Sequence, residues 1–376
     1  MTGLKALICA VLSLVLFTGS AGAAQIPDTS AVSAVLMDAD SGRILYAKNE
    51  DEQRLIASIT KLMTALVAAQ ALDADTVITV PASAVLVEGS SMGLRGGDTL
   101  TVRDLLTGML LSSGNDAANA AALVTAGSLP AFADRMNRTA AALGMSRSLF
   151  VTPSGLDEGE HGSTARDMAL LGAAVLRAPL LSEICASKTA QITLSGRTVT
   201  YTNHNRLLSL YAPAIGLKTG FTKKSGRCLV SAAERDGVTL VVATLNGGDY
   251  WNDHIALYEY GFSLTERVSL TAPALSALPV IGGTVGEVAV RLPEAEAVTL
   301  VNGEASKITC RVIRPAYVWA PLAAGDTVGT VRYECDGRTL CELPILAAET
   351  VQARAPLSFF EKWKRQSTAL LTALLE

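Results

Sequence analysis

A serine and a lysine three residues apart, Ser58 and Lys61, are the first pair in the sequence whose types and spacing suit chemistry. A serine hydroxyl becomes a good nucleophile when a neighbour accepts its proton, and a lysine amine can do this if burial or nearby cations lower its pKa. On a helix, this spacing places both side chains on one face. Lys61 is also the only charge between Arg54 and Asp73, and a lone buried ammonium is costly without a partner or a role. The alternative is an ordinary helical serine beside a lysine that reaches solvent.

Two further short motifs place polar side chains where a cleft can use them. Ser113-Gly114-Asn115 lies in a break between two apolar stretches, where serine can relay a proton and asparagine can hold a carbonyl or the lysine. Lys218-Thr219-Gly220 is expected to end a strand, with lysine and threonine suited to a carboxylate and glycine allowing close approach of a substrate backbone. The structural alternatives are a helix cap for the first motif and a solvated strand end for the second.

The segments around these motifs predict an α+β domain. The strand-like runs Ser33–Met37 and Ile44–Tyr46 predict a hairpin. Ile56–Leu72 lacks Gly and Pro and predicts a helix that carries the serine and the lysine. More helices and then strands follow, an order that fits a sheet completed by both ends of the domain, with helices packed against it. Helices are predicted at Val102–Leu111, Ala117–Val124 and Met168–Leu176, and strands at Thr198–Thr202, Ala214–Thr219, Cys228–Ala233 and Val238–Leu245.

The sequence after about Leu264 has no helical pattern until its last residues. Short valine-rich runs alternate with Gly, Pro, Asn and Asp, which predicts a small β-sandwich or barrel ending near Ala347. Cys310, Cys335 and Cys341 cluster in this part, which leaves one disulfide among them open. The five cysteines after residue 23 are an odd number, so a complete disulfide framework is excluded.

The N-terminus has the pattern of a secretory signal. An apolar run spans Leu7–Phe17 after the basic Lys5, and the small residues Ala21-Gly22-Ala23 follow it. This pattern predicts a signal peptide over residues 1–23 and an exported chain. The apolar run is short for the alternative, an uncleaved membrane anchor.

The C-terminal residues 356–376 form a separate segment. Apolar side chains, Phe360 and Trp363 among them, recur at helical spacing beside a basic cluster at residues 362–365. An amphipathic helix of this kind suits the surface of an anionic membrane. The alternative is a terminal helix docked on its own domain.

Charge and composition argue against several other classes. The 31 basic and 35 acidic residues nearly balance and form no basic patch, so nucleic-acid binding is not expected. The three histidines are widely spaced and no C-x-x-C pair occurs, so we expect neither a metal site nor a histidine-dependent triad. His161 is expected to be a loop or core residue and Cys228 a packing residue.

Taken together and in this order, the three motifs resemble the signature of the penicillin-recognising serine peptidases, S-x-x-K, S-x-N and K-T-G. The chain looks most like the low-molecular-mass penicillin-binding proteins that are D-alanyl-D-alanine carboxypeptidases, in which Gly114 is the expected middle residue. The stretches Thr152–Asp157 and Ser163–Met168 are also similar. The resemblance implies a β-lactamase/transpeptidase-like catalytic domain, an antiparallel sheet with helices, over residues 24–263. It further implies a small all-β domain over 264–350 and a membrane-associating helix over 356–376.

The resemblance also implies the chemistry of the first motifs. Ser58 would attack the carbonyl of the penultimate D-alanine of a peptidoglycan stem peptide while Lys61 takes its proton. Ser113 would relay a proton to the leaving D-alanine, and Asn115 would orient the substrate amide and Lys61. Water would then hydrolyse the acyl-enzyme, and no metal or organic cofactor is expected.

The third motif is implied to bind the substrate. Lys218 and Thr219 would hold its terminal carboxylate, and Gly220 would let its backbone approach. The backbone N–H groups of Phe221 and of the nucleophilic serine would form the oxyanion hole. β-Lactam antibiotics would acylate the same serine, on the outer face of the cytoplasmic membrane. The rival hypotheses are a D,D-endopeptidase, a β-lactamase, and a catalytically silent protein that binds wall peptides.

Overall fold

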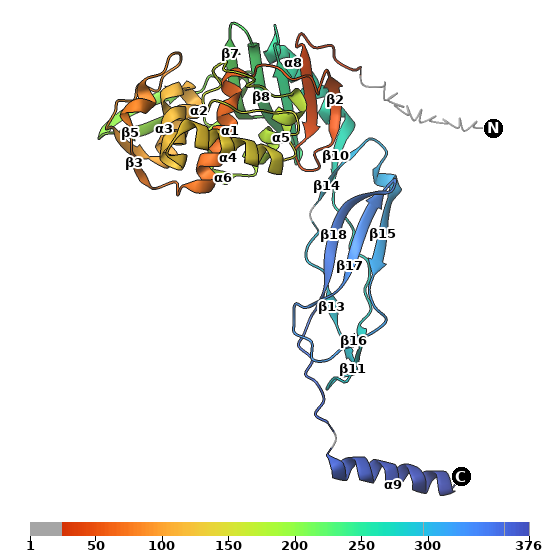
Figure 1. Cartoon of the computed structure of the whole chain (residues 1–376). Coiled ribbons are helices and arrows are strands. Elements are labelled where there is room, and N and C mark those ends of the chain that lie inside the picture. Colours follow the sequence, from red (N-terminus) through yellow and green to blue (C-terminus); the bar gives the residue numbers. More distant parts are fainter. Residues whose placement is uncertain (1–24, 296, 357, 376) are drawn as a thin grey trace, which may run out of the picture.

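The computed structural model of the chain describes residues 25–295, 297–356 and 358–375, so the predicted signal peptide lies outside the described residues (Figure 1). A five-stranded antiparallel sheet with the order β2-β1-β9-β8-β7 is the centre of the larger part. The start and the end of this part both contribute strands, as the sequence predicted. The strands are β1 (Ser33–Asp38), β2 (Ile44–Lys48), β7 (Ala214–Thr222), β8 (Gly226–Arg235) and β9 (Val238–Leu245).

Helices cover both faces of this sheet (Figure 1). Alternate side chains of a strand point to opposite faces. Val35 and Met37 therefore join the larger core with α1 and α5, while Leu36 joins a smaller core with Tyr258 of α8. The helices are α1 (Lys61–Ala71), α2 (Val102–Ser112), α3 (Asn115–Ala126), α4 (Leu129–Ala142), α5 (Ala165–Leu176), α6 (Pro179–Ala186), α7 (Leu207–Leu210) and α8 (Tyr250–Leu264). Two small hairpins pair β3 (Val77–Thr79) with β4 (Thr99–Thr101) and β5 (Thr189–Leu194) with β6 (Arg197–Thr202).

The helix predicted for Ile56–Leu72 is divided in two. A short 3-10 helix, η1 (Ala57–Thr60), carries the serine, and α1 begins only at Lys61. The cause is a close contact with a distant loop: a Cβ at Gly155 would lie 2.0 Å from the carbonyl oxygen of Ala57, whose own φ is +48°. The packing of this loop therefore sets the shape of the turn, which intrinsic helix propensity does not predict.

In the described part of the chain, no single helix is long and apolar enough to cross a membrane. Only α5 and α6 taken together reach that length and composition, and they are bent by 103° relative to each other.

The second part of the chain is a β-sandwich that extends away from the helical part (Figure 1). A three-stranded sheet, β12-β11-β16, and a four-stranded sheet, β13-β18-β17-β15, share one apolar core, and β10 pairs with β14 next to the larger part. This architecture confirms the predicted all-β domain. The strands are β10 (Thr265–Val268), β11 (Leu278–Ile281), β12 (Glu287–Val288), β13 (Val290–Arg291), β14 (Val298–Val301), β15 (Ile308–Ile313), β16 (Val318–Trp319), β17 (Thr327–Cys335) and β18 (Arg338–Ala347).

The sequence left open one disulfide among the three cysteines of this part. No disulfide joins Cys310 and Cys341, which lie in one row across the sheet. Cys310 of β15 and Cys341 of β18 both pair with Tyr333 of the intervening strand β17. Two strand spacings, about 10 Å, separate such positions, more than a disulfide can span. Cys335 is a buried free thiol that donates to the carbonyl oxygen of Glu304.

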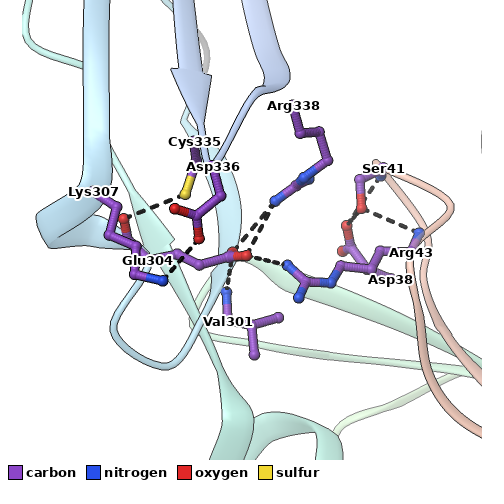
Figure 2. Close-up of polar contacts among 9 residues, drawn as sticks. All are labelled: Asp38, Ser41, Arg43, Val301, Glu304, Lys307, Cys335, Asp336 and Arg338. Atoms are coloured by element: carbon purple, nitrogen blue, oxygen red, sulfur yellow. Dashed lines mark hydrogen bonds and ion pairs between the residues drawn. The ribbon is translucent and has the colours of Figure 1, made fainter.

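A polar junction connects the two parts (Figure 2). Glu304 accepts hydrogen bonds from Arg43, in the β1–β2 hairpin, at 2.6 Å and from Arg338, at the start of β18, at 3.3 Å. Its carboxylate also accepts from the backbone N–H of Val301 at 2.9 Å. These contacts lower the pKa of Glu304 against the opposing effect of its partial burial. The junction is thus held by paired charges.

The last helix, α9 (Phe359–Leu375), lies at the far end of the β-sandwich from the helical part (Figure 1). Ser358 and Glu361 cap its start reciprocally, since each side chain accepts from the other residue's backbone N–H. Phe359, Phe360 and Trp363 are 85%, 77% and 61% exposed, so their rings are not docked on the described part of the chain.

Candidate active site

Lys61 is the centre of a buried polar cluster that contains two of the three predicted motifs. Its Nζ lies 2.9 Å from Ser58 Oγ, 2.7 Å from Asn115 Oδ1 and 2.6 Å from the carbonyl oxygen of Ser154. The side chain is fully buried. The structure therefore confirms the contact between the Ser58 and Lys61 side chains that their spacing predicts.

The electrostatics of the cluster favour a neutral Lys61. Burial lowers its pKa well below the ordinary lysine value, the charge of Lys218 lowers it further, and only Asp116 opposes this. A neutral amine has two N–H donors and one lone pair. The carbonyl oxygens of Asn115 and Ser154 can only accept, so they use both donors, and the lone pair is left for the hydroxyl proton of Ser58. The arrangement suits proton transfer from the serine to the lysine.

His161 supports the turn that carries the serine. The backbone N–H of Val151 donates to His161 Nδ1 at 3.0 Å, so the proton of the neutral ring is on Nε2, which lies 2.9 Å from Thr60 Oγ1. Burial lowers the pKa of His161 to about 4, which keeps the ring neutral near pH 7. The residue is buried, as expected for a core histidine, but it also fixes the position of η1.

The loop Thr152–Leu156 closes around the same turn. Pro153 and Ser154 supply the carbonyl oxygens that accept from Thr64 Oγ1 and from the Lys61 amine, both at 2.6 Å. The sequence marked this stretch by resemblance, but it did not predict that a main-chain carbonyl would be the third partner of Lys61. Backbone oxygens carry no residue-type signal, so only the fold identifies them.

Ser113-Gly114-Asn115 occupies the break between α2 and α3, as predicted. Ser113 ends α2 with φ +62°, and its hydroxyl has no hydrogen-bond partner among the residues that the structure describes. A Cβ at Gly114 would lie 2.7 Å from the backbone nitrogen of Met92, so glycine is needed for the close approach of that loop. Asn115 begins α3 and donates from Nδ2 to the carbonyl oxygen of Glu88 at 2.7 Å, which orients its Oδ1 toward Lys61.

Asp116 is a buried residue that the sequence reading did not identify. Its carboxylate accepts from the backbone N–H groups of Met92, Gly93 and Leu94 at 2.8 to 3.0 Å and from the hydroxyl of Ser91 at 2.6 Å. It therefore holds the loop that borders the site. A carboxylate directly after the S-x-N motif was the available signal.

Lys218-Thr219-Gly220 lies beside the serine. The sequence predicted that this motif ends a strand, and that prediction is wrong. The motif lies inside β7, because pairing with β8 continues to Thr222. A Cβ at Gly220 would lie 3.0 Å from the backbone nitrogen of Ser58, so β7 can pass this close only with glycine at that position.

The two polar side chains of this third motif differ in their exposure. Lys218 is 2% exposed and donates to the carbonyl oxygen of Thr219 at 2.9 Å, while Thr219 itself is half-buried. Burial lowers the pKa of Lys218 to about 8, opposed only by the Cys185 thiol. The next residue, Phe221, is 63% exposed. In the part of the chain that the structure describes, no three His, Cys, Asp or Glu side chains form a group that could hold a metal.

Comparison with known proteins identifies the family. Residues 20–248 match the family described as D-alanyl-D-alanine carboxypeptidase, and residues 272–353 match the C-terminal domain of penicillin-binding protein 5. The chain is 34% identical to the D-alanyl-D-alanine carboxypeptidase DacC of Escherichia coli over 361 residues, 90% of each chain. It is 28% identical to DacF of Bacillus subtilis over 345 residues, 88% of each chain.

Solved structures agree with these matches. Penicillin-binding protein 5 from Haemophilus influenzae superposes with a TM-score of 0.68 at 29% identity, covering 87% of this chain and 99% of that one. A mutant of the Streptomyces K15 DD-transpeptidase superposes with a TM-score of 0.61 at 32% identity, covering 64% of this chain and all of that one. With a catalytic domain built around a serine–lysine pair and a β-sandwich after it, the chain belongs to the D-alanyl-D-alanine carboxypeptidase family of serine hydrolases.

Proposed function

We propose that this carboxypeptidase removes the terminal D-alanine from peptidoglycan stem pentapeptides through an acyl-enzyme on Ser58. The observation that carries the proposal is the bonding of Lys61, whose Nζ lies 2.9 Å from Ser58 Oγ and donates to the carbonyl oxygens of Asn115 and Ser154. In the first step, Ser58 Oγ attacks the carbonyl carbon of the penultimate residue, and its proton passes to the Lys61 amine. Ser113, whose hydroxyl has no partner in the described residues, then passes a proton to the leaving amine.

Substrate binding falls to β7 and to the start of α3. The ammonium of Lys218 and the hydroxyl of Thr219 bind the terminal carboxylate, and Asn115 orients the substrate amide. The backbone N–H groups of Ser58 and Phe221 bind the carbonyl oxygen as it gains negative charge, and the closeness of β7 to η1 at Gly220 supports this pairing. Water completes the cycle by hydrolysing the ester.

We further propose that the chain is exported, with residues 1–23 removed, and acts on the outer face of the cytoplasmic membrane. In this arrangement residues 24–263 form the catalytic domain, 264–350 the β-domain and 356–376 the membrane-associating helix. The exposed rings of Phe360 and Trp363 support insertion of α9 into the membrane surface. Deleting residues 356–376 should abolish co-sedimentation with anionic vesicles. Unchanged co-sedimentation would contradict this role of the helix.

The test of the main proposal is product analysis with a pentapeptide that ends in D-Ala-D-Ala. The wild-type chain should release one D-alanine per peptide, and Ser58→Ala should release none while remaining folded. Cleavage of cross-linked dimers in place of pentapeptides would indicate a D,D-endopeptidase. Rapid turnover of penicillin without peptide turnover would indicate a β-lactamase. Binding of the peptide without acylation would indicate a silent wall-binding protein.

A further inference from the structure

A concave surface outside the candidate active site lies beside the N-terminal end of β8. It is a cavity of about 740 Å³ at the start of α8, bordered by the aromatic pair Tyr250 and Trp251 and by Arg206 and Arg227. The two rings stack with their centroids 4.3 Å apart. His204, Asn203, Gly248 and Asp249 complete its lining. Stacked aromatic rings beside guanidinium groups can bind the apolar face of a sugar together with an attached anion.

The two arginines are not used by the fold. Within the ranges that the structure describes, neither guanidinium makes an ion pair or a hydrogen bond, although the chain as a whole has a net charge of −4. Both charges act on the Tyr250 hydroxyl: burial raises its pKa, and Arg227 and Arg206 oppose that rise. The carboxylate in the lining, Asp249, accepts from Asn252 at 2.8 Å and makes no ion pair with either arginine.

The cavity is adjacent to the proposed substrate strand. β7 is the edge strand of the sheet, and Arg227 of β8 pairs directly with Phe221, the residue after the K-T-G motif. Gly220 faces the serine, whereas Arg227 lies on the sheet face that α8 covers, together with Leu229 two residues along β8. In the lining of the cavity, burial lowers the pKa of His204, and the charge of Lys218 lowers it further. The motif and the cavity are thus neighbours at the edge of the sheet, on its opposite faces.

We propose that this cavity is a binding site for an anionic saccharide, the carboxylate- or phosphate-bearing wall polymer that carries or surrounds the peptide substrate. Arg206 and Arg227 bind the anion, and Trp251 stacks on a sugar ring. The identification of the ligand as wall polymer rests on the proposed peptidase function, while the recognition chemistry rests on the cavity alone.

Calorimetric titration of the full mature chain tests the proposal with three probes: a carboxylate-bearing glycan strand freed of its peptides, a glucosylated poly(glycerol phosphate), and a neutral N-acetylglucosamine oligomer. The wild type should bind one or both anionic probes, more weakly as salt is added, and more tightly than the neutral oligomer. The double variant Arg206→Gln/Arg227→Gln should lose about tenfold in affinity or more, as expected for removing charge-assisted hydrogen bonds. Trp251→Ala should weaken binding of all probes that bind.

Matched controls distinguish binding at this cavity from non-specific electrostatic attraction. Arg135→Gln/Arg138→Gln removes two exposed arginines from α4, and Trp319→Ala removes a tryptophan that is 65% exposed on the β-sandwich. These controls should bind like the wild type. Preference for the glycan or for the glucosylated poly(glycerol phosphate) identifies the source of the anion. No binding of either anionic probe, or equal losses in the test and control variants, would overturn the proposal. Because the probes contain no peptide, a failure of Ser58 chemistry appears separately, as absent acylation by penicillin.

Discussion

The proposed active site and the junction between the two parts of the chain both contain ionisable side chains, but their surroundings affect the charge in opposite ways. At the active site, Lys61 and Lys218 are buried without an anion bonded to them, and the pKa of each is lowered. At the junction, Glu304 is only partly buried and bonds to Arg43 and Arg338. These partners stabilise its negative charge, and its pKa is therefore lowered. Burial without a counter-ion suits Lys61 to act as a base, whereas ion pairing with access to solvent keeps the Glu304 carboxylate charged.

The largest effect should come from removing the buried amine. Lys61→Met keeps the side-chain volume but removes the proton acceptor, so the rate of acylation at Ser58 should fall by about 10²- to 10⁴-fold. The rate is measured with labelled penicillin, from samples quenched at successive times and separated on a gel. Lys188→Met, an exposed lysine on the same domain, is the control and should react like the wild type. An active Lys61→Met protein would show that the lysine is not the base.

A smaller loss is expected from moving β7 away from the serine without changing any charge. The Cβ of Gly220→Ala would lie 2.9 Å from the Ile59 nitrogen and 3.0 Å from the Ser58 nitrogen, so the backbone must shift. Misplacement of about 1 Å can reduce the rate by about 10²-fold. Gly286→Ala is the control, because no atom lies within 4 Å of its added Cβ. Equal acylation rates for the two variants would contradict the close fit of β7.

The third effect separates the two buried lysines by pH. Lys218 is charged below its pKa of about 8 and neutral above it, so attraction of the substrate carboxylate should be lost as pH rises through that value. KM for the pentapeptide should then rise by up to about tenfold per pH unit above pH 8. A pentapeptide amide, which has no terminal carboxylate, is the control substrate. A KM that stays constant from pH 7 to 9.5 would exclude Lys218 as the carboxylate-binding group.

The smallest effect should occur at the junction. Glu304→Gln removes the charge that pairs with Arg43 and Arg338, and its coupling to Arg43→Met in a double-mutant cycle should be about 0.5–1 kcal/mol. Urea unfolding measures the coupling, and turnover of the short pentapeptide should not change. The exposed pair Lys307–Asp336, visible beside the junction in Figure 2, is the control and should couple by close to zero. A large loss of turnover in Glu304→Gln would show that the junction does influence the site.

The same contrast explains what the sequence could and could not predict. Ser58 and Lys61 were predictable as partners because the spacing is local and a turn of helix brings them together. The carbonyl of Ser154 was not, because it lies 93 residues away from Lys61 in the sequence and any residue type can supply it. The end of β7 was misplaced because β8, not local composition, determines how far the pairing continues.

The order of strands and helices followed from periodicity, and the hairpin, α2, α3, β9 and the β-sandwich agree with it. The contacts that hold the site residues in place could not be predicted from this periodicity. His161 was predicted only as a core or loop residue, and its bond to Thr60 depends on a fold that brings two distant segments together. The ion pairs of Glu304 likewise join residues far apart in the sequence, so no local sequence pattern predicts them.

The pH dependence of penicillin acylation, followed by intact-protein mass spectrometry with peptide mapping, tests the central claim most directly. One penicillin should attach to Ser58. At saturating penicillin, where weaker carboxylate binding by neutral Lys218 does not limit the rate, the rate should rise with pH until Lys61 is neutral and then level off well below pH 10.5, the ordinary lysine value. No adduct on folded protein, an adduct on another residue, or a rate that still rises tenfold per unit at pH 10 would contradict a buried, neutral Lys61 as the base.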